Sequence, residues 1–177
     1  MLDSDDDSGE FTLAEASTRE GEIPSIKRFN DLDSEKEFIL QRLKLLQKYS
    51  PDESICLLHR TNFGVSSAVN DLQNNQIKCE KINSSSSVNY LDNSVKVSTM
   101  QSVKGLEFDH VIIYDLTDNN LPISSGFSEP DDELHITTER RLLYTCMTRA
   151  ANTLLITYSG SPSRYFAEIN SNLIDEQ

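Results

Sequence analysis

The sequence predicts an α/β fold in which a mostly parallel sheet lies between helices on both of its faces, giving three layers. Two apolar runs, SICLLH at 54–59 and HVIIYDL at 110–116, are typical of strands that are covered on both sides. Segments with a helical spacing of apolar residues alternate with the predicted strands, which favours parallel pairing. With 177 residues and no internal repeat, the chain has the length of one ordinary domain.

The composition indicates an acidic, folded protein. The chain has 16 Lys and Arg residues and 29 Asp and Glu residues, a net charge of −13, which argues against a surface that holds nucleic acid by phosphate neutralisation alone. Five of the first ten residues are acidic. We interpret residues 1–20 as an acidic, largely disordered or chain-edge segment and residues 21–177 as one domain.

Cysteine usage and hydropathy indicate the compartment. The three cysteines are odd in number and have no CxxC spacing, so we expect buried thiols rather than disulfides or a zinc site. No apolar run approaches the ~18–20 residues that a membrane span needs, and the acidic start is unlike a signal peptide. A cytoplasmic protein without a membrane partner is therefore expected. These cysteines are Cys56, Cys79 and Cys146.

The first half of the domain is expected to contain three strands and two helices. A strand over 23–29 is followed by a helix that Asp33 or Ser34 caps. A second strand over 54–59 leads into a helix that ends near Gln73. A weaker strand at 77–82 and a loop in the serine run at 84–87 follow. The apolar stripe of the first helix is expected to consist of Phe38, Leu40, Leu43, Leu45, Leu46 and Tyr49.

The second half begins with a strand over 95–99, where apolar and polar residues alternate. A connection over 101–109, too short for a full crossover helix, precedes the strand at 110–116. The polar segment 117–138 contains two prolines and a glycine and is expected to be a long loop, of the kind that is often functional. A helix over 138–151, a strand over 153–158 and a closing helix over 161–169, with Pro162 in its first turn, complete the domain.

The first segment that could carry chemistry is VKVSTMQSVKGLEFDHVIIYD, residues 95–115. Its strand brings Thr99 and Gln101 to the carboxyl edge of the sheet, where ligands bind in open α/β folds. Lys104 and Glu107 lie beside Gly105, which permits a tight turn. Taken alone, charged loop residues are more often simply solvated.

The second segment is ERRLLYTCMTRAANTLLITY, residues 139–158. On a helix, Arg141 and Arg149 would lie on a polar side, opposite an apolar face that includes Leu143 and Cys146. Two guanidinium groups on one face could bind a phosphate. The alternative is a solvated charged face in which Glu139 pairs with its neighbours.

The third segment is ICLLHRTN, residues 55–62. Arg60, Thr61 and Asn62 follow the end of a buried strand, so they too are expected at the carboxyl edge. His59 has no carboxylate or nucleophile near it in the sequence and is interpreted as a packed or surface histidine rather than a general base.

Several familiar catalytic patterns are absent from the sequence. It contains no GxxxxGK[ST] phosphate loop, no GxGxxG after a strand, no HExxH, no GxSxG and no Cys/His spacing of a metal site. We therefore expect no metal site, and the chain alone should not cradle a triphosphate or act as an autonomous hydrolase.

Together and in order, the three segments resemble the second motor domain of UvrD/Rep/PcrA-type DNA helicases of superfamily 1, over about residues 21–158. STMQSVKGLEFDHVII is similar to motif V, usually T-x-H-x-x-KGLEF-D-x-V, and ERRLLYTCMTRA to motif VI, usually E-x-RRL-x-Y-x-A-x-TRA. ICLLHRTN resembles the strand that ends in R-T-N between motifs IV and V. The resemblance implies a RecA-like, P-loop NTPase-like fold and a DNA-unwinding or translocating motor with 3′–5′ polarity.

The resemblance also implies roles for single residues. Arg149 matches the motif VI arginine that reaches across the domain cleft to the ATP γ-phosphate. Glu107 matches the glutamate that touches the nucleotide sugar, Lys104 and Gly105 shape that loop, and Arg141 is a further nucleotide-binding candidate. The DNA-contacting positions are matched by Arg60, Thr61, Asn62, Thr99 and Gln101.

On this interpretation, the cofactor is ATP with Mg²⁺, shared with an N-terminal RecA-like domain of the same parent protein. That domain supplies the Walker A motif, so we expect this chain to be inactive alone and to bind no nucleotide tightly. Single-stranded DNA is the expected track.

Two departures from the family pattern matter. The usual histidine of motif V is Gln101 here, whose amide can still donate to a phosphate but cannot be charged. Only the stretch 63–94 replaces a large inserted subdomain, which is typical of the compact branch with nuclease-fused helicases and HelD-type RNA polymerase recycling factors. Motif IV should lie upstream of Phe11 and is absent. The alternative function is thus a non-catalytic interaction module of a helicase-like factor, with RNA polymerase as its partner.

Overall fold

The computed structural model describes residues 21–83, 87–90, 92–123 and 133–176. The expected disorder of 1–20, most of the serine loop at 84–87 and part of the loop at 117–138 therefore lie outside the described residues. The elements are β1 (Ser25–Phe29), α1 (Leu32–Tyr49), β2 (Ile55–His59), α2 (Asn62–Asn74), β3 (Cys79–Lys81), β4 (Val95–Thr99), η1 (Met100–Val103), β5 (Phe108–Ile113), α3 (Glu133–Met147), β6 (Ala150–Ser159), η2 (Arg164–Glu168), η3 (Ser171–Leu173) and β7 (Asp175–Glu176).

The strands of the described ranges form one seven-stranded sheet in the order β3-β4-β2-β5-β6-β1-β7, and every neighbouring pair is parallel. His59 of β2 pairs with Thr99 of β4, and Leu58 pairs with Ile113 of β5. This register places the carboxyl ends of β4, β2 and β5 at one edge, so the segments that follow these adjacent strands are neighbours.

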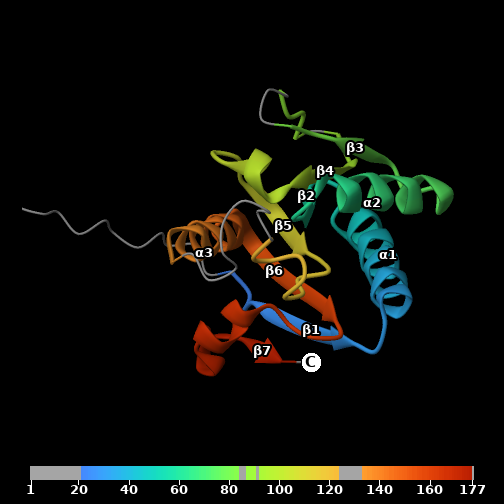
Figure 1. Ribbon diagram of the computed structural model, residues 1–177. Helices are drawn as coiled ribbons and strands as arrows, with labels where there is room; N and C mark the ends of the chain where they lie inside the picture. The colour runs from blue at the N-terminus through green and yellow to red at the C-terminus, as the bar shows by residue number, and fades with distance from the viewer. Residues whose placement is uncertain (1–20, 84–86, 91, 124–132, 177) are drawn as a thin grey trace, which may run out of the picture.

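Helices cover both faces of the sheet, which confirms the predicted three-layer α/β architecture and is consistent with a RecA-like fold (Figure 1). Apolar side chains of α1 and α2 pack on one face, among them Ile39, Leu43, Val65 and Leu72, against Leu57, Val97 and Ile112 of the strands. On the other face α3, η1 and η2 contribute Leu143, Cys146, Met100, Val103 and Tyr165, against Cys56, Leu58, Val111 and Ile156.

Helix α1 begins earlier than expected. Its N-cap is Asp31, whose carboxylate accepts a hydrogen bond from the Ser34 backbone N–H at 2.7 Å, rather than Asp33 or Ser34. The buried stripe also differs, because Leu45 and Tyr49 are 49% and 70% exposed while Glu35 and Ile39 are buried. The apolar residues of this segment span more than one side of a 3.6-residue helix, and only one side can face the sheet.

Apolar and polar residues alternate along β4, but its polar side chains do not form an exposed face of the sheet. Lys96 is only 1% exposed and donates to Glu80 of β3 at 2.8 Å and to the Ser94 hydroxyl at 2.7 Å. Ser98 is buried and donates to the Ile82 carbonyl. Because helices cover both faces, the polar residues of this strand are buried with partners.

The predicted helix at 138–151 is displaced in the structure. Helix α3 spans Glu133–Met147, and β6 already begins at Ala150. Arg149 therefore lies in the turn between helix and strand and not on the helix. The expected closing helix at 161–169 is a 3₁₀ segment, Arg164–Glu168, and β5 ends at Ile113 rather than at 116. None of the described helices is both long and apolar enough to cross a membrane.

Candidate nucleotide and nucleic-acid interface

The carboxyl edge of the sheet brings the segment after β2 next to the segment after β4. Arg60, which follows β2, contacts Gln101, which follows β4. Asn62 and Gln101 are both exposed there. Two of the three segments that were singled out in the sequence thus meet at this edge, as expected for segments that follow neighbouring parallel strands.

Arg60 is not a free cation at this edge. Its Nε and Nη2 groups each donate to a carboxylate oxygen of Glu139 on α3 at 2.7 Å. The two side chains are only 11% and 6% exposed. Glu139 therefore pairs with a residue far away in the sequence and not, as the alternative interpretation had it, with its helical neighbours.

Thr61 and Thr99 have structural contacts of their own. The Thr61 hydroxyl caps α2 by accepting from the Gly64 N–H at 3.1 Å, and its backbone N–H donates to His59 Nδ1 at 2.9 Å. The Thr99 hydroxyl lies 3.0 Å from that of Ser102. Their roles in DNA binding stay predictions, and the Thr61 side chain is engaged by the cap.

The loop at 104–107 is exposed except for Leu106, which is half-buried. Gly105 has φ of +83°, in the left-handed region, and a Cβ there would meet no atom of the described residues within 4 Å. Glycine is thus required by the backbone conformation and not by a close approach of other atoms. The side chains of Lys104 and Glu107 lie on the surface.

Arg149 touches this loop directly. Its Nη1 donates to the Leu106 carbonyl at 3.3 Å, its Nε to the Thr145 carbonyl at 3.0 Å and its Nη2 to the Thr148 hydroxyl at 3.2 Å. The Phe108 N–H donates to the Arg149 carbonyl at 2.9 Å. Within the described ranges the guanidinium has neutral acceptors and no carboxylate, so its charge is not cancelled by an ion pair.

Arg141 is placed differently. It is exposed on α3 and lines a hollow of about 360 Å³ together with Tyr144, Met147 and Tyr165. Neither Arg149 nor the loop at 104–107 lines this hollow. The role of Arg141 in nucleotide binding stays a prediction.

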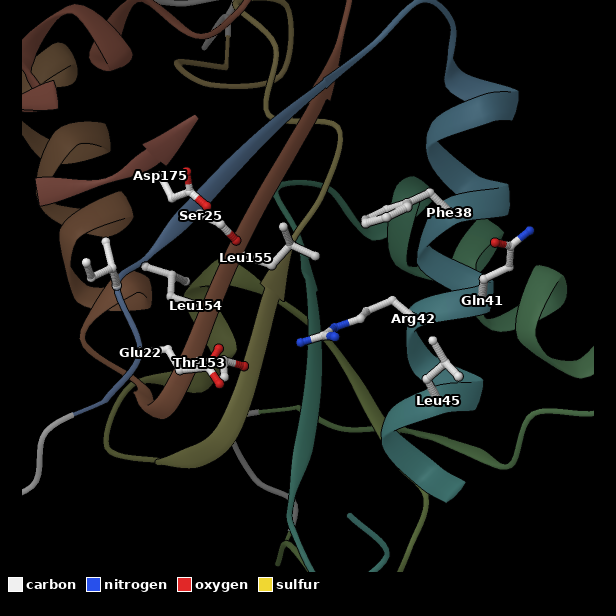
Figure 2. Close-up of a pocket in the computed structure, with 11 residues that line it drawn as sticks. Glu22, Ser25, Phe38, Gln41, Arg42, Leu45, Thr153, Leu154, Leu155 and Asp175 are labelled. Carbon is white, nitrogen blue, oxygen red and sulfur yellow. The ribbon is translucent and has the colours of Figure 1, made fainter. Parts of the chain in front are cut away.

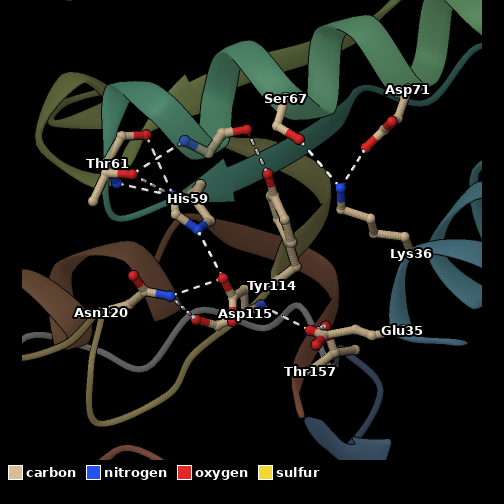
Figure 3. A network of polar contacts seen from close by, with 11 residues as sticks. Glu35, Lys36, His59, Thr61, Ser67, Asp71, Tyr114, Asp115, Asn120 and Thr157 are labelled. Atoms are coloured by element: carbon tan, nitrogen blue, oxygen red, sulfur yellow. Dashed lines mark hydrogen bonds and ion pairs between the residues drawn. The ribbon is translucent and has the colours of Figure 1, made fainter. Parts of the chain in front are cut away.

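A buried polar network lies beside the same edge (Figure 3). His59 is buried, which is one of the two placements expected for it, and its Nε2 lies 3.4 Å from a carboxylate oxygen of Asp115, which has φ of +53°. Glu35 of α1 accepts from the Asp115 N–H at 2.7 Å and from the Thr157 hydroxyl at 2.6 Å. The other Glu35 oxygen has no hydrogen-bond partner among the residues that the structure describes. Burial raises the pKa of this carboxyl above its ordinary value.

Sequence reasoning missed the parts of the site that come from distant segments. Glu139, the Leu106 carbonyl and Asp115 are such partners. Only Glu139 could have been found from the sequence, because it is an acidic residue in a stretch whose other charged residues are basic. The contacts of the Leu106 carbonyl and of Asp115 depend on how the loops pack.

A separate pocket of about 440 Å³ lies between α1 and strands β1 and β6 (Figure 2). Figure 2 shows the Arg42 side chain reaching from α1 toward the strands. Phe38, Leu45 and Thr153 also line it, and none of the predicted site residues does.

The half of the chain that carries the motifs is similar in sequence to known proteins. Residues 83–161 match the family described as the UvrD-like helicase C-terminal domain. The ATP-dependent DNA helicase PcrA of Staphylococcus aureus is 36% identical over 96 residues, 48% of this chain and 13% of that protein. PcrA of Staphylococcus epidermidis is 38% identical over 95 residues, 47% of this chain and 13% of that protein. The chain thus spans only a small part of these relatives.

A solved structure supports the fold over nearly the whole chain. The C-terminal domain of a possible DNA helicase from Lactobacillus plantarum superposes with a TM-score of 0.70 at 21% sequence identity. The match covers 90% of this chain and 88% of that one. At this identity the likeness shows the fold alone.

Proposed function

We propose, from the match of residues 83–161 to the UvrD-like helicase C-terminal domain family, that the chain is the second motor domain of an ATP-dependent DNA helicase or translocase. One observation carries the proposal: the Arg149 guanidinium contacts the Leu106 carbonyl, so the two motif-bearing segments form one surface. That surface presents the cation of Arg149 beside the exposed Lys104 and Glu107.

The chemistry of this surface suits half of an ATP site. Arg149 holds its guanidinium on neutral oxygens, and such contacts are easily exchanged for the charged oxygens of a phosphate. A cation that meets the transferring phosphoryl group stabilises its developing charge. ATP with Mg²⁺ would be held mainly by an N-terminal RecA-like domain of the parent protein, which supplies the phosphate loop that this sequence lacks.

The nucleic-acid side of the motor is proposed at the adjacent edge, where Asn62, Thr99 and Gln101 lie. Its track would be single-stranded DNA, traversed in the 3′–5′ direction. RNA polymerase is the partner in the alternative function, a non-catalytic interaction module, and the net charge of −13 is the observation that favours it.

The test is the substitution Arg149→Ala in the full-length parent protein. Turnover of ATP is expected to fall roughly 10³-fold or more, because removal of a trans-acting arginine has that effect in related chemistry. The fold should survive, since Arg149 is half-buried in a turn and its truncation opens no core cavity. Arg149→Lys should restore little activity because an ammonium cannot reproduce the guanidinium fork.

Arg140→Ala is the matched control, since Arg140 is an exposed arginine of the same helix that pairs with Glu168 of η2. Turnover and melting temperature are measured on the same preparations. A stable and fully active Arg149→Ala protein would remove Arg149 from the ATP site. A folded parent protein without any ATPase activity would support the interaction module instead.

A further inference from the structure

We infer that Arg60 is a positioning residue and not itself a nucleic-acid ligand: it fixes the Gln101 side chain so that the amide NH2 group faces outward as a donor for a phosphate oxygen of a single-stranded nucleic acid. This inference rests on the proposed function, because it concerns the proposed nucleic-acid edge, and it changes the role that the sequence alone assigned to Arg60.

The charge of Arg60 is already neutralised inside the domain. The guanidinium makes a two-pronged pair with Glu139, and both side chains are nearly buried. Glu139 is held in turn, since one of its oxygens also accepts from the Ile123 N–H at 3.3 Å. A phosphate that bound Arg60 directly would have to compete with a buried carboxylate, which costs far more than binding an exposed cation.

The remaining N–H groups of Arg60 determine the orientation of Gln101. The Gln101 side-chain oxygen accepts from Nη1 and, at 3.1 Å, from Nη2 of Arg60. The opposite orientation would set the amide NH2 against these donors, so the hydrogen bonds assign the oxygen to the Arg60 side. The NH2 end of the same planar amide therefore points away from Arg60, on an exposed side chain.

This orientation matters because an unrestrained glutamine can present either an acceptor or a donor. A phosphate oxygen accepts only, so half of the amide orientations would be useless or repulsive. A chain with a net charge of −13 also has few cationic side chains that could bind the phosphates of a nucleic acid. A neutral donor held in one orientation by a buried pair meets this need without an exposed charge.

The test is binding of a fluorescein-labelled oligothymidylate to the purified chain at about 50 mM salt, followed by anisotropy. Gln101→Ala removes the donor. A double variant, Arg60→Met with Glu139→Met, removes the anchor without leaving one buried charge unpaired, as a single Arg60→Ala change would. Gln101→Ala is expected to weaken binding roughly 10-fold or more, the loss typical of one hydrogen bond to a charged group. The double variant should weaken binding by a smaller factor, because an unanchored amide can still turn its NH2 group outward. The three changes combined should weaken binding no further than Gln101→Ala alone.

Two readouts separate positioning from direct contact. The slope of log K against log salt should be the same for the wild type and the double variant, because no phosphate contact by a cation is lost. The NMR signals of the Gln101 side-chain NH2 should shift more on adding the oligonucleotide in the wild type than in the double variant. The substitution pair Arg140→Ala and Glu168→Ala removes an exposed ion pair of α3 and η2 and is the control, with unchanged affinity.

The outcomes that contradict the inference are distinct from failure of the proposed function. If the triple variant loses affinity multiplicatively, or the slope falls by about 0.7 in the double variant, Arg60 binds phosphate directly and the inference is wrong. If the wild type binds the oligonucleotide and Gln101→Ala binds it equally well, the inference is wrong, while the proposed function is unaffected. If the folded wild-type chain binds no oligonucleotide at this salt, the proposed nucleic-acid edge itself fails, and the inference with it.

Discussion

His59 lies at the end of β2 with its ring directly against Gly64 in the first turn of α2. A Cβ on Gly64 would collide with Nδ1, Cγ and Cε1 of the ring. The ring cannot move aside, because it is buried and packs on Tyr114 with ring centroids 4.8 Å apart. Glycine at 64 is therefore demanded by packing, although glycine is a poor helix former.

Gly64→Ala is expected to lower the free energy of unfolding by about 1–3 kcal/mol, the usual cost of overpacking. Urea denaturation of the chain is the measurement. Ser66→Ala on the exposed side of the same helix should be neutral or slightly stabilising. The loss should disappear when Gly64→Ala is made in a His59→Ala background, and a loss that persists there would contradict the packing explanation.

Glu35 predicts a pH dependence of stability. Its pKa is raised by burial, and the nearby Asp115 adds to the rise, while the hydrogen bond from Thr157 opposes it. A raised pKa favours the protonated form in the folded chain. The stabilisation is therefore complete below the ordinary glutamate pKa of 4.5 and is lost as pH rises through the higher folded value.

The measurement is the free energy of unfolding of the wild type and of Glu35→Gln from about pH 4 upward, with Glu37→Gln as the exposed control on α1. Relative to Glu35→Gln, the wild type should lose stability with rising pH, by at most about 1.4 kcal/mol per pH unit. Parallel curves for the two proteins would show that Glu35 is ionised to the same extent in the folded and unfolded chain.

At the scale of elements, the structure differs from the sequence prediction at the start of α1, where Asp31 and not Asp33 or Ser34 is the N-cap. The Ser34 N–H holds the pKa of the Asp31 carboxyl below its usual range, as expected for a cap. Asp31→Ala should lower the melting temperature by about 2–4 °C, whereas Asp33→Ala, in the first turn, should change it less. Equal effects of the two substitutions would refute Asp31 as the cap.

At the scale of the whole molecule, the chain presents one surface of a site that we propose is completed by another domain. Calorimetry of the purified chain with ATP and Mg²⁺ should therefore show weak binding and negligible turnover, because one guanidinium without a phosphate loop cannot hold a triphosphate. Micromolar affinity with steady hydrolysis would contradict the half-site. The melting temperature of the same sample confirms that it is folded.

The sequence by itself determined the class of fold and the order of the strands along the chain. Apolar runs such as 54–59 and 110–116 fall close to β2 and β5, because continuous burial on both faces leaves a local signature. The spacing of the motif segments is likewise a one-dimensional property, and the comparison over 83–161 confirms the resemblance. The roles of Arg149 and its companions stay predictions.

Only the tertiary structure decided which polar groups meet. Arg60 and Glu139 are paired although 79 residues separate them in the sequence, and Arg149 contacts Leu106 from a turn that was predicted to lie inside a helix. Side-chain direction and strand register fix such contacts, and both depend on packing between segments far apart in the chain. Propensities and periodicity act over a few residues and therefore carry no information about them.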